Sequence, residues 1–346
     1  MENREVTLAD IASKMQVSPA TVSKALSGRR GVSKELRSRV LQTAEELGYR
    51  RTEPSAKHVQ RRMKKVGVLV GENFYGRERS YYAKMYGELR DEALASNWSC
   101  ELELLTPQME KSRAMPKLLG EGLIDGLIIL GPLEAGYFSA VAEKSSVPFV
   151  CLDAADEKHE YDCVVTDNYY GMYRMTRYLL EKGHRKISFV GTVGSTDSIT
   201  DRYYGYLKAM EEAGISTSRR DVIPDRDTRE GKNYELKLPE TEDMPTAFAC
   251  NCDLTAAAVI RLLEERGLKV PGDISVVGFD AWLYPGTCDV AVTSYENDIR
   301  EMAARSLYIL RHKVEGRYYK KGVSIIEGRL VELQSVRELT SAERHA

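Results

Sequence analysis

Charged and aromatic side chains stand at the ends of several apolar runs, where they could bind a small polar ligand. The run PFVCLD ends at Asp153, the run ISVVGFD ends at Asp280, and Arg202 follows the run KISFVG. Carboxylates and a guanidinium suit a ligand with several hydroxyl groups, because each charge can hold two of them. Flat apolar faces for a sugar ring are offered by three aromatic residues, Tyr81, Tyr82 and Trp282.

Each of these residues also has a plain structural interpretation. Asp153 could cap a strand end, and Arg202 could form an ion pair between two parts of the fold. Tyr81 and Tyr82 open a helical pattern and could belong to the core. The chain has no G-x-G-x-x-G after a strand, no G-x-x-x-x-G-K-[ST] and no G-x-S-x-G. The His and Cys residues lack metal-ligand spacing, so we expect no catalytic residue, metal or cofactor.

A second constellation lies in VSPATVSKALSG, residues 17–28. Ser18 is a good N-cap and Pro19 suits the first position of a helix, whose inner face is then Val22, Ala25 and Leu26. The outer face consists of small, hydroxyl and basic side chains, namely Pro19, Ala20, Thr21, Ser23 and Lys24. Such a face lets a helix enter the major groove of DNA, where Lys24 can reach a base edge or a phosphate.

This helix belongs to a predicted bundle of three. Thr7 begins the first helix, whose apolar face is Leu8, Ile11, Ala12 and Met15, and Ser33 caps the third. Two short helices closed by a third form a helix-turn-helix unit. The alternative is a small helical interaction domain with a solvated face.

Charge is distributed unevenly along the 346 residues. Residues 1–65 hold 15 Lys and Arg against 7 Asp and Glu, whereas the rest of the chain holds 35 against 45. A basic head on an acidic body indicates that only the head meets a polyanion. No apolar run is long enough to span a membrane and MENREVTLAD is no signal peptide, so we expect a cytoplasmic protein with no membrane contact.

From Val66 onward, short apolar runs alternate with amphipathic helical stretches. Strand candidates are 66–70, 100–105, 126–130, 148–153, 186–191, 246–250 and 274–279, and helix candidates include 82–96, 171–182, 203–213 and 254–266. This alternation predicts an α/β core of two doubly wound lobes with parallel sheets. A ligand cleft is then expected at the carboxyl ends of the strands.

The chain resembles the lac repressor (LacI/GalR) family of bacterial transcription regulators. The run VTLADIASKMQVSPATVSKALSGRRGVSKELRSRVLQTAEELGY, residues 6–49, is similar to that family's headpiece, including the core TVS. The resemblance implies that Pro19, Ala20 and Lys24 read operator bases. It also implies that four hydroxyl residues hold phosphates or orient the helix, namely Thr7, Ser18, Thr21 and Ser23.

The linker departs from the family pattern. In residues 50–65 the proline is Pro54, one residue late, and Ala56 and Val59 take the spacing of Ala-x-x-Leu. The resemblance implies a hinge helix here that wedges open the minor groove of the operator. A basic tether that grips phosphates is the alternative, because valine is a shorter wedge and a weaker helix former.

The resemblance continues through VVTDNYYGMYRMTRYLLEKGHRKISFVG (164–191) and GLKVPGDISVVGFD (267–280). It implies a periplasmic-binding-protein-like core over 66–335, a tail over 336–346, and crossings between lobes near 153–165, 278–294 and 323–335. The resemblance places Tyr81, Tyr82, Asp153, Ser198, Arg202 and Asp280 at the effector site, and Trp282 remains a candidate from its aromatic face alone. The family's Asn-Asp pair reads Asn251-Cys252-Asp253 here, so either Asn251 or Cys252 takes the effector asparagine's place.

Three functions remain open from sequence. The first is a homodimeric transcription regulator, most often a repressor in this family, that binds near-palindromic operator DNA under control of a sugar or sugar phosphate. Carbohydrate-metabolism genes are the expected targets. The second is an enzyme that converts a sugar or nucleotide and carries a basic appendage. The third is an exported sugar-binding protein, which the missing signal and the DNA-reading head disfavour.

Overall fold

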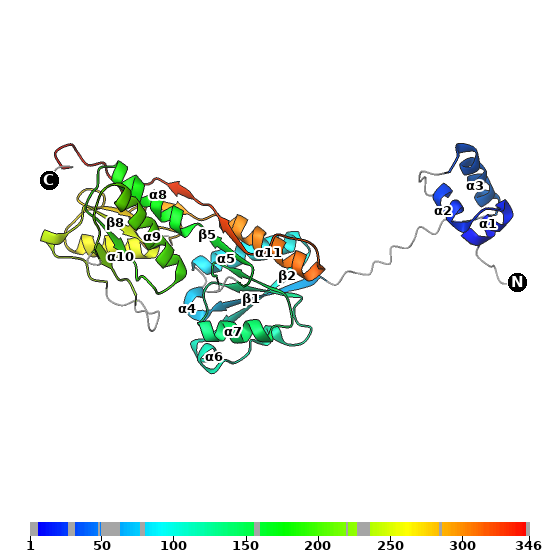
Figure 1. Cartoon of the computed structure of the whole chain (residues 1–346), viewed down its shortest axis with the longest axis horizontal. Helices are drawn as coiled ribbons and strands as arrows, with labels where there is room; N and C mark the ends of the chain where they lie inside the picture. Colours follow the sequence, from blue (N-terminus) through cyan, green and yellow to red (C-terminus); the bar gives the residue numbers. More distant parts are fainter. Residues whose placement is uncertain are drawn as a thin grey trace. The chain divides into compact units, whose positions relative to one another are not determined.

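The computed structural model describes residues 6–26, 32–47, 49, 63–76, 80–155, 160–218, 221–226, 236–283 and 286–343. The chain divides into two compact units, Met1–Arg62 and Met63–Ala346 (Figure 1).

The amino-terminal unit contains three helices around one small core. They are α1 (Leu8–Met15), α2 (Pro19–Leu26) and α3 (Lys34–Glu46). Thr7 and Asp10 form a capping box on α1, Ser18 accepts from the backbone N–H of Thr21, and Ser33 caps α3. The core residues come from all three helices: Ile11, Ala12, Val22, Ala25, Val40 and Ala44. The predicted bundle and its starting caps are confirmed.

The first lobe of the second unit is built on a six-stranded parallel sheet. Its order is β11-β5-β4-β3-β1-β2. The strands are β1 (Lys64–Gly71), β2 (Trp98–Leu105), β3 (Gly126–Leu130), β4 (Phe149–Leu152), β5 (Cys163–Thr166) and β11 (Val323–Ile326). All five pairings are parallel, as expected for strands that are apolar on both faces.

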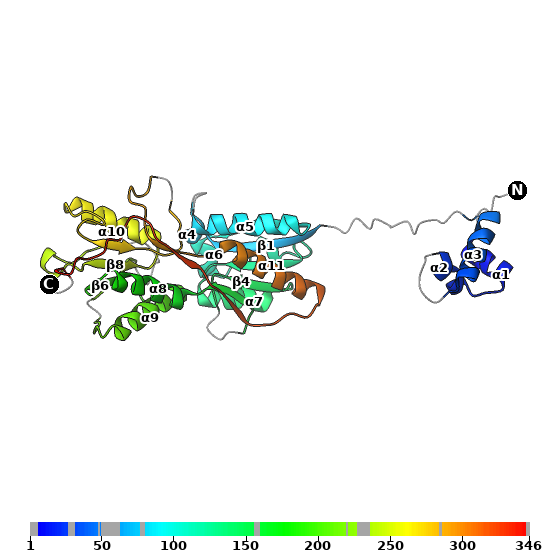
Figure 2. The same ribbon diagram turned by 90° about the horizontal axis from the view of Figure 1, so that it is seen from above.

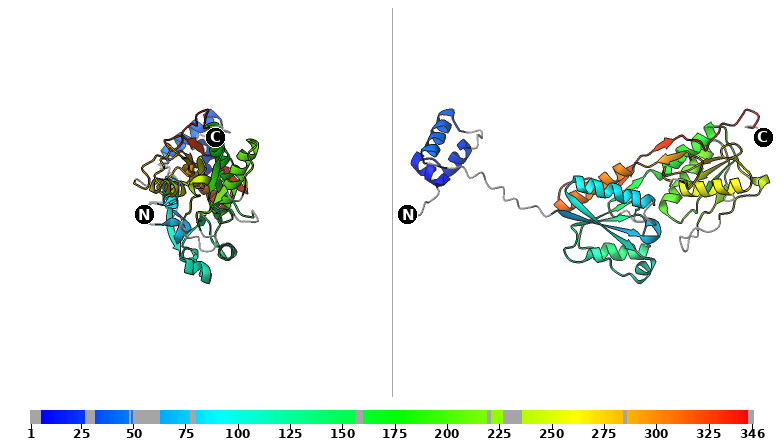
Figure 3. Two further views of the ribbon diagram at one scale, coloured as in Figure 1. Left: turned by 90° about the vertical axis from the view of Figure 1, so that its left-hand side faces the viewer. Right: turned by 180° about the vertical axis from the view of Figure 1, so that it is seen from behind.

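Helices cover both faces of this sheet. Strand β1 divides its side chains accordingly: Val68 and Val70 pack toward α5 (Tyr81–Ala95) and α11 (Ile299–Glu315), and Leu69 packs toward α7 (Ala135–Lys144). The right-hand view of Figure 3 shows this layering. The shorter elements α4 (Glu72–Tyr75), α6 (Pro107–Ser112) and η1 (Lys117–Leu119) connect the strands.

The second lobe has a four-stranded parallel sheet in the order β7-β6-β8-β9. Its strands are β6 (Ile187–Val190), β7 (Val222–Ile223), β8 (Ala247–Cys250) and β9 (Ser275–Val277). One face packs on α8 (Asn168–Glu181) and α9 (Asp197–Glu212), and the other packs on α10 (Asp253–Glu265) (Figure 2). A short turn, η3 (Thr241–Asp243), precedes β8. Helices α8 and α9 approach closely because position 205 is glycine: a Cβ there would overlap the carbonyl of Tyr169.

Three passages join the lobes. The antiparallel pair β10 (Ser294–Glu296) and β12 (Arg329–Val331) forms two of them, on the way into α11 and out of β11. The third lies at Asp167, between β5 of the first sheet and α8 of the second lobe. We expected this passage near 153–165. It lies just beyond that range because Cys163–Thr166 still pairs with the first sheet. The passage expected near 278–294 likewise lies later, at 294–298, because the chain stays against the second lobe until β10.

Helix starts are the other difference from expectation. α8 begins at Asn168 and α9 at Asp197, several residues before the apolar periodicity indicated. The side chains of Asp167 and Thr196 cap these helices and set their starts. No helix in the described part of the chain is both long and apolar enough to cross a bilayer.

Candidate functional site

The outer face of α2 carries the side chains predicted to meet DNA. Pro19, Ala20, Ser23 and Lys24 are exposed, whereas Val22 and Ala25 on the opposite face are fully buried. This face has only one long side chain, Lys24, among residues too small to keep a groove wall at a distance. The helix therefore presents a narrow surface with one cation.

The hydroxyl residues of this unit lie at helix starts. The Thr7 hydroxyl donates to Asp10, and Thr21 Oγ1 lies 2.8 Å from Ser18 Oγ. These contacts fix the beginnings of α1 and α2, which orients the outer face. Ala56 and Val59, the predicted minor-groove wedge, lie outside the described residues.

Arg202, on α9, is the centre of a buried network at the junction of the two lobes. Its Nε donates to Asn168 Oδ1 at 2.8 Å, its Nη1 donates to the carbonyl of Asn251, and its Nη2 donates to Asp280 Oδ1 at 3.0 Å. The guanidinium also lies 3.8 Å from the ring centroid of Phe279. The side chain thus holds α8, the end of β8 and the loop after β9 in one arrangement.

Tyr81 and Tyr82, at the start of α5, bring the first lobe into this network. Asn297 links the lobes: its Nδ2 donates to Tyr81 Oη at 2.8 Å and to Asp280 Oδ1 at 3.1 Å. The Tyr82 hydroxyl donates to Asp153 Oδ2 at 2.9 Å, and the two tyrosine rings meet edge to face with centroids 5.5 Å apart. Their rings also pack on the first lobe's core, as the structural interpretation of this pair expected, and a role in binding an effector stays a prediction.

Several acidic groups at the junction have pKa values above their usual range. Burial raises the pKa of Asp153 to about 6, while Arg202 lowers it and Asp280 raises it. Burial and repulsion from Asp153 also raise the pKa values of Tyr81 and Tyr82 well above their usual range. The two carboxylates sit on backbone with positive φ, 59° at Asp153 and 90° at Asp280. Such conformations are uncommon for residues other than glycine and cluster at binding sites.

Of the two candidates for the effector asparagine's place, Asn251 does not bring its side chain to the junction. Its Nδ2 donates to Val190 O, Asp225 Oδ2 and Thr255 Oγ1, all within the second lobe. The buried carboxylate of Asp225 needs these donors, and they turn the amide away. Only the backbone carbonyl of Asn251 reaches Arg202.

Cys252 lies closer to the junction. Its thiol is 3.3 Å from Thr255 Oγ1, and after burial the largest influence raising its pKa is Asp280. It stands at the N-cap of α10 without making a side-chain cap. A thiol is a weak hydrogen-bond partner, so this position offers bulk rather than a strong polar contact.

Ser198 and Trp282 flank the network. Ser198 Oγ lies 3.0 Å from Thr196 Oγ1 at the start of α9, one turn before Arg202. The Trp282 backbone N–H donates to Asp253 Oδ2, and Lys84 of α5 lies 4.7 Å from the centroid of the Trp282 ring. Trp282 therefore forms a second contact between the lobes.

Both units match described protein families. Residues 7–52 match the bacterial regulatory proteins of the lacI family, and residues 176–336 match the periplasmic binding protein-like domain. The chain belongs to the lacI family. It is a transcription regulator with a helix-turn-helix head and an effector-binding type of core.

Full-length relatives of this lacI-family chain are transcriptional repressors. The HTH-type transcriptional repressor PurR of Aliivibrio salmonicida is 27% identical over 344 residues, covering 96% of this chain and 99% of the relative. PurR of Klebsiella pneumoniae subsp. pneumoniae is 26% identical over 333 residues, covering 95% and 96%.

Solved structures show the same fold. The transcriptional regulator CelR in complex with cellobiose has a TM-score of 0.66 at 20% identity, covering 96% of this chain and 100% of that one. The lac repressor dimer bound to operator and the anti-inducer ONPF has a TM-score of 0.65 at 22% identity, with the same coverage.

Sequence reasoning missed several residues that complete the site of this lacI-family regulator. Asn168 and Asn297 stand beside passages between the lobes, a position that could have marked them. Asp253 is buried, accepts from Ser294 Oγ at 2.7 Å and from the N–H of Trp282, and has its pKa raised by burial to about 7. It fits only because residue 278 is glycine: any other residue would have a Cβ that overlaps the Asp253 carboxylate. No local sequence signal points to that contact.

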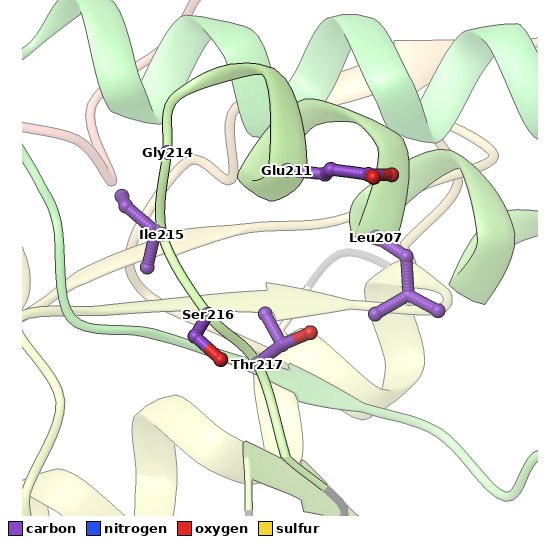
Figure 4. A pocket seen from close by; sticks show the side chains of 6 residues that line it. All are labelled: Leu207, Glu211, Gly214, Ile215, Ser216 and Thr217. Atoms are coloured by element: carbon purple, nitrogen blue, oxygen red, sulfur yellow. The ribbon is translucent and has the colours of Figure 1, made fainter.

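Hollows elsewhere on the core do not involve the predicted residues. One of about 410 Å³ lies at the end of α9, lined by Leu207, Glu211, Gly214, Ile215, Ser216 and Thr217 (Figure 4). Another of about 350 Å³ lies between α11 and β11. Among the described residues, no group of three or more His, Cys, Asp or Glu side chains could hold a metal ion.

Proposed function

We propose that this chain is a cytoplasmic, homodimeric repressor that binds near-palindromic operator DNA and is switched by a small effector between its lobes. A sugar or sugar phosphate is the proposed effector, and carbohydrate-metabolism genes are the proposed targets. The protein binds this molecule without converting it.

The proposal for DNA rests on α2. Its exposed face carries Pro19, Ala20, Ser23 and Lys24, and residues 1–65 carry the chain's excess of positive charge. One such helix covers half of an operator, so two copies related by a twofold axis read an inverted repeat. The basic segment 50–65 supplies further phosphate contacts, with Ala56 and Val59 as the proposed minor-groove contacts.

The proposal for an effector rests on one observation: the bonds of Asn297 and Asp280 connect Tyr81 of the first lobe to Arg202 of the second. A ligand that touches both sides changes how the lobes close, since it binds one arrangement better than another. Asp153, Cys252, Trp282 and Ser198 are the other residues that we propose contact the effector. Two proteins of similar fold bind sugars, namely CelR in complex with cellobiose and a regulator from Alkaliphilus metalliredigens QYMF in complex with D-xylulofuranose, which supports a sugar here.

The experiment is selection of duplexes from a random pool by the full chain, followed by measurement of affinity at two salt concentrations. We expect an inverted repeat whose two halves are one helical turn apart, bound more weakly as salt rises. Enrichment of no sequence, or of a single half-site without a repeat, would refute the proposal.

A further inference from the structure

The junction contains a buried acceptor that has no donor. Asn297 is 4% exposed, and among the described residues its Nδ2 donates two hydrogen bonds, to Tyr81 Oη and to Asp280 Oδ1. Its Oδ1 has no hydrogen-bond partner in the described part of the chain. The amide cannot be turned round, because the Asp280 carboxylate requires a donor. A buried acceptor left unpaired is destabilising, so this oxygen favours a ligand that brings an N–H or O–H.

The junction also has more negative than positive charge. The guanidinium of Arg202 donates hydrogen bonds to Asp280, Asn168 and the Asn251 carbonyl. Among the described residues, the Asp153 carboxylate accepts a hydrogen bond only from the Tyr82 hydroxyl, and no Lys or Arg lies within ion-pair distance of it. Its carboxyl is still mostly ionised at neutral pH, because burial raises its pKa only to about 6. Among the described residues, Asp153 therefore has no ion-pair partner of its own, although Arg202 attracts its charge from farther away.

The other cations near the junction are already placed elsewhere. Arg226 is paired with Asp225, its Nη2 lying 2.7 Å from Asp225 Oδ2. Lys84 of α5 lies over the ring of Trp282 at 4.7 Å from its centroid and pairs with none of the described carboxylates. An anionic ligand would meet the carboxylates of Asp153 and Asp280, while the charge of Arg202 is already paired with Asp280. Adding a second negative charge to a partly buried site is costly, whereas adding a positive one relieves it.

We infer that the effector is a sugar-sized polyhydroxylated amine, whose ammonium group pairs with Asp153 beside Asp280 and whose neighbouring donor reaches Asn297 Oδ1. An ammonium brings three donors and no acceptor, which matches two carboxylates and an unpaired amide oxygen. This inference rests on the proposed function and narrows its ligand: it excludes sugar phosphates. The hydroxyl groups of the same molecule remain for Arg202 and the tyrosines.

The test uses matched sets of probes on the full chain. D-glucose, D-glucosamine and D-glucose 6-phosphate form one set, and D-mannose, D-mannosamine and D-mannose 6-phosphate another, each titrated by calorimetry at pH 7 with thermal unfolding as a second readout. We expect an amino sugar to bind about tenfold more tightly than its neutral and phosphorylated counterparts. Equal or tighter binding of a neutral or phosphorylated sugar would overturn the inference and leave the proposed function standing. No binding by any member would overturn both.

A variant of Asp153 tests whether this residue causes the preference for an amino sugar. Asp153→Asn removes the charge but keeps the shape, and asparagine tolerates the left-handed backbone at this position. The amine should then lose its advantage over the neutral sugar. Asp91→Asn, an exposed aspartate on α5, is the matched control and should retain the advantage. An undiminished amine preference in Asp153→Asn would contradict the assignment.

Discussion

At the scale of single residues, Arg202 decides how the junction is held. Its three donors reach three segments, and its side chain is 6% exposed. A planar guanidinium does this because its donors diverge at fixed angles, which an ammonium cannot reproduce. The same rigidity makes the arrangement of Asp280 depend on this one side chain.

Replacing Arg202 by alanine should abolish the response to effector. It leaves the partly buried Asp280 carboxylate without its ion-pair partner, which lowers the unfolding free energy by about 3 kcal/mol or less. Calorimetric titration and urea denaturation measure the two effects, and Arg202→Lys separates the lost charge from the lost geometry.

Arg177→Ala, on the exposed side of α8, is the control and should change neither measurement. If Arg202→Ala folds and still responds to effector, Arg202 does not belong to the binding site.

Residue positions were predictable only where strand ends fix them. Asp153 and Asp280 meet at the junction because each follows a strand of a parallel sheet, one in each lobe, and the carboxyl ends of both sheets face the junction. Arg202 reaches them from α9. Asn251 stands at the same edge, yet its side chain turns inward to Asp225, a carboxylate that the sequence does not mark as buried. Asn297 and Asn168 escaped notice because lone asparagines beside loops are common.

At the scale of elements, α2 has one face that packs on the core and one exposed face that is predicted to meet DNA. Val22 and Ala25 hold it to the core, and the small outer residues leave room for a groove wall. Periodicity and caps predicted this bundle well, because short helices with strong N-caps carry their own signals. The starts of α8 and α9 were less predictable, since Asp167 and Thr196 cap helices whose first turns lack apolar periodicity.

Lys24→Ala should weaken binding to the selected operator by about 1–3 kcal/mol and relax its discrimination among sequences. Lys14→Ala is the matched control, because Lys14 lies on α1 beside Glu46 at 3.5 Å. Fluorescence anisotropy with specific and scrambled duplexes measures both. Unchanged discrimination in Lys24→Ala would remove this residue from base recognition.

His184, in the turn between α8 and β6, should make the stability of the fold depend on pH. His184 is fully buried, with Nε2 3.2 Å from the Arg337 carbonyl and Nδ1 3.0 Å from Thr246 Oγ1. Burial lowers its pKa to about 4. Between its ordinary pKa of about 6.5 and that value, the unfolded chain binds a proton that the native protein does not.

Stability should therefore fall as pH drops from about 6.5 to 4, by up to about 3 kcal/mol from this group. Above about pH 6.5, His184 is neutral in both the native and the unfolded state, so it does not change the unfolding free energy with pH. His184→Gln should flatten the profile of unfolding free energy against pH, and His312→Gln on α11 serves as the matched substitution. An identical slope in wild type and His184→Gln would show that this histidine is not the cause.

At the scale of the whole molecule, the core is two lobes joined by three passages, and the network of Arg202, Asp280 and Asn297 lies at the second passage. A ligand bound there affects both lobes through strong, short contacts. The sequence predicted two parallel-sheet lobes from the alternation of strands and helices. It could not predict the network, because that depends on residues more than 200 positions apart, such as Tyr81 and Asn297.

The central claim is that one molecule couples an operator to a small effector, so the deciding measurement is operator affinity with and without a saturating ligand. The full chain is titrated onto its selected inverted repeat by anisotropy, alone and with the probe that binds the core most tightly. We predict a change of about 5–150-fold in either direction, mirrored by the same factor in ligand affinity when operator is present. An operator affinity that stays the same at ligand saturation would contradict the account.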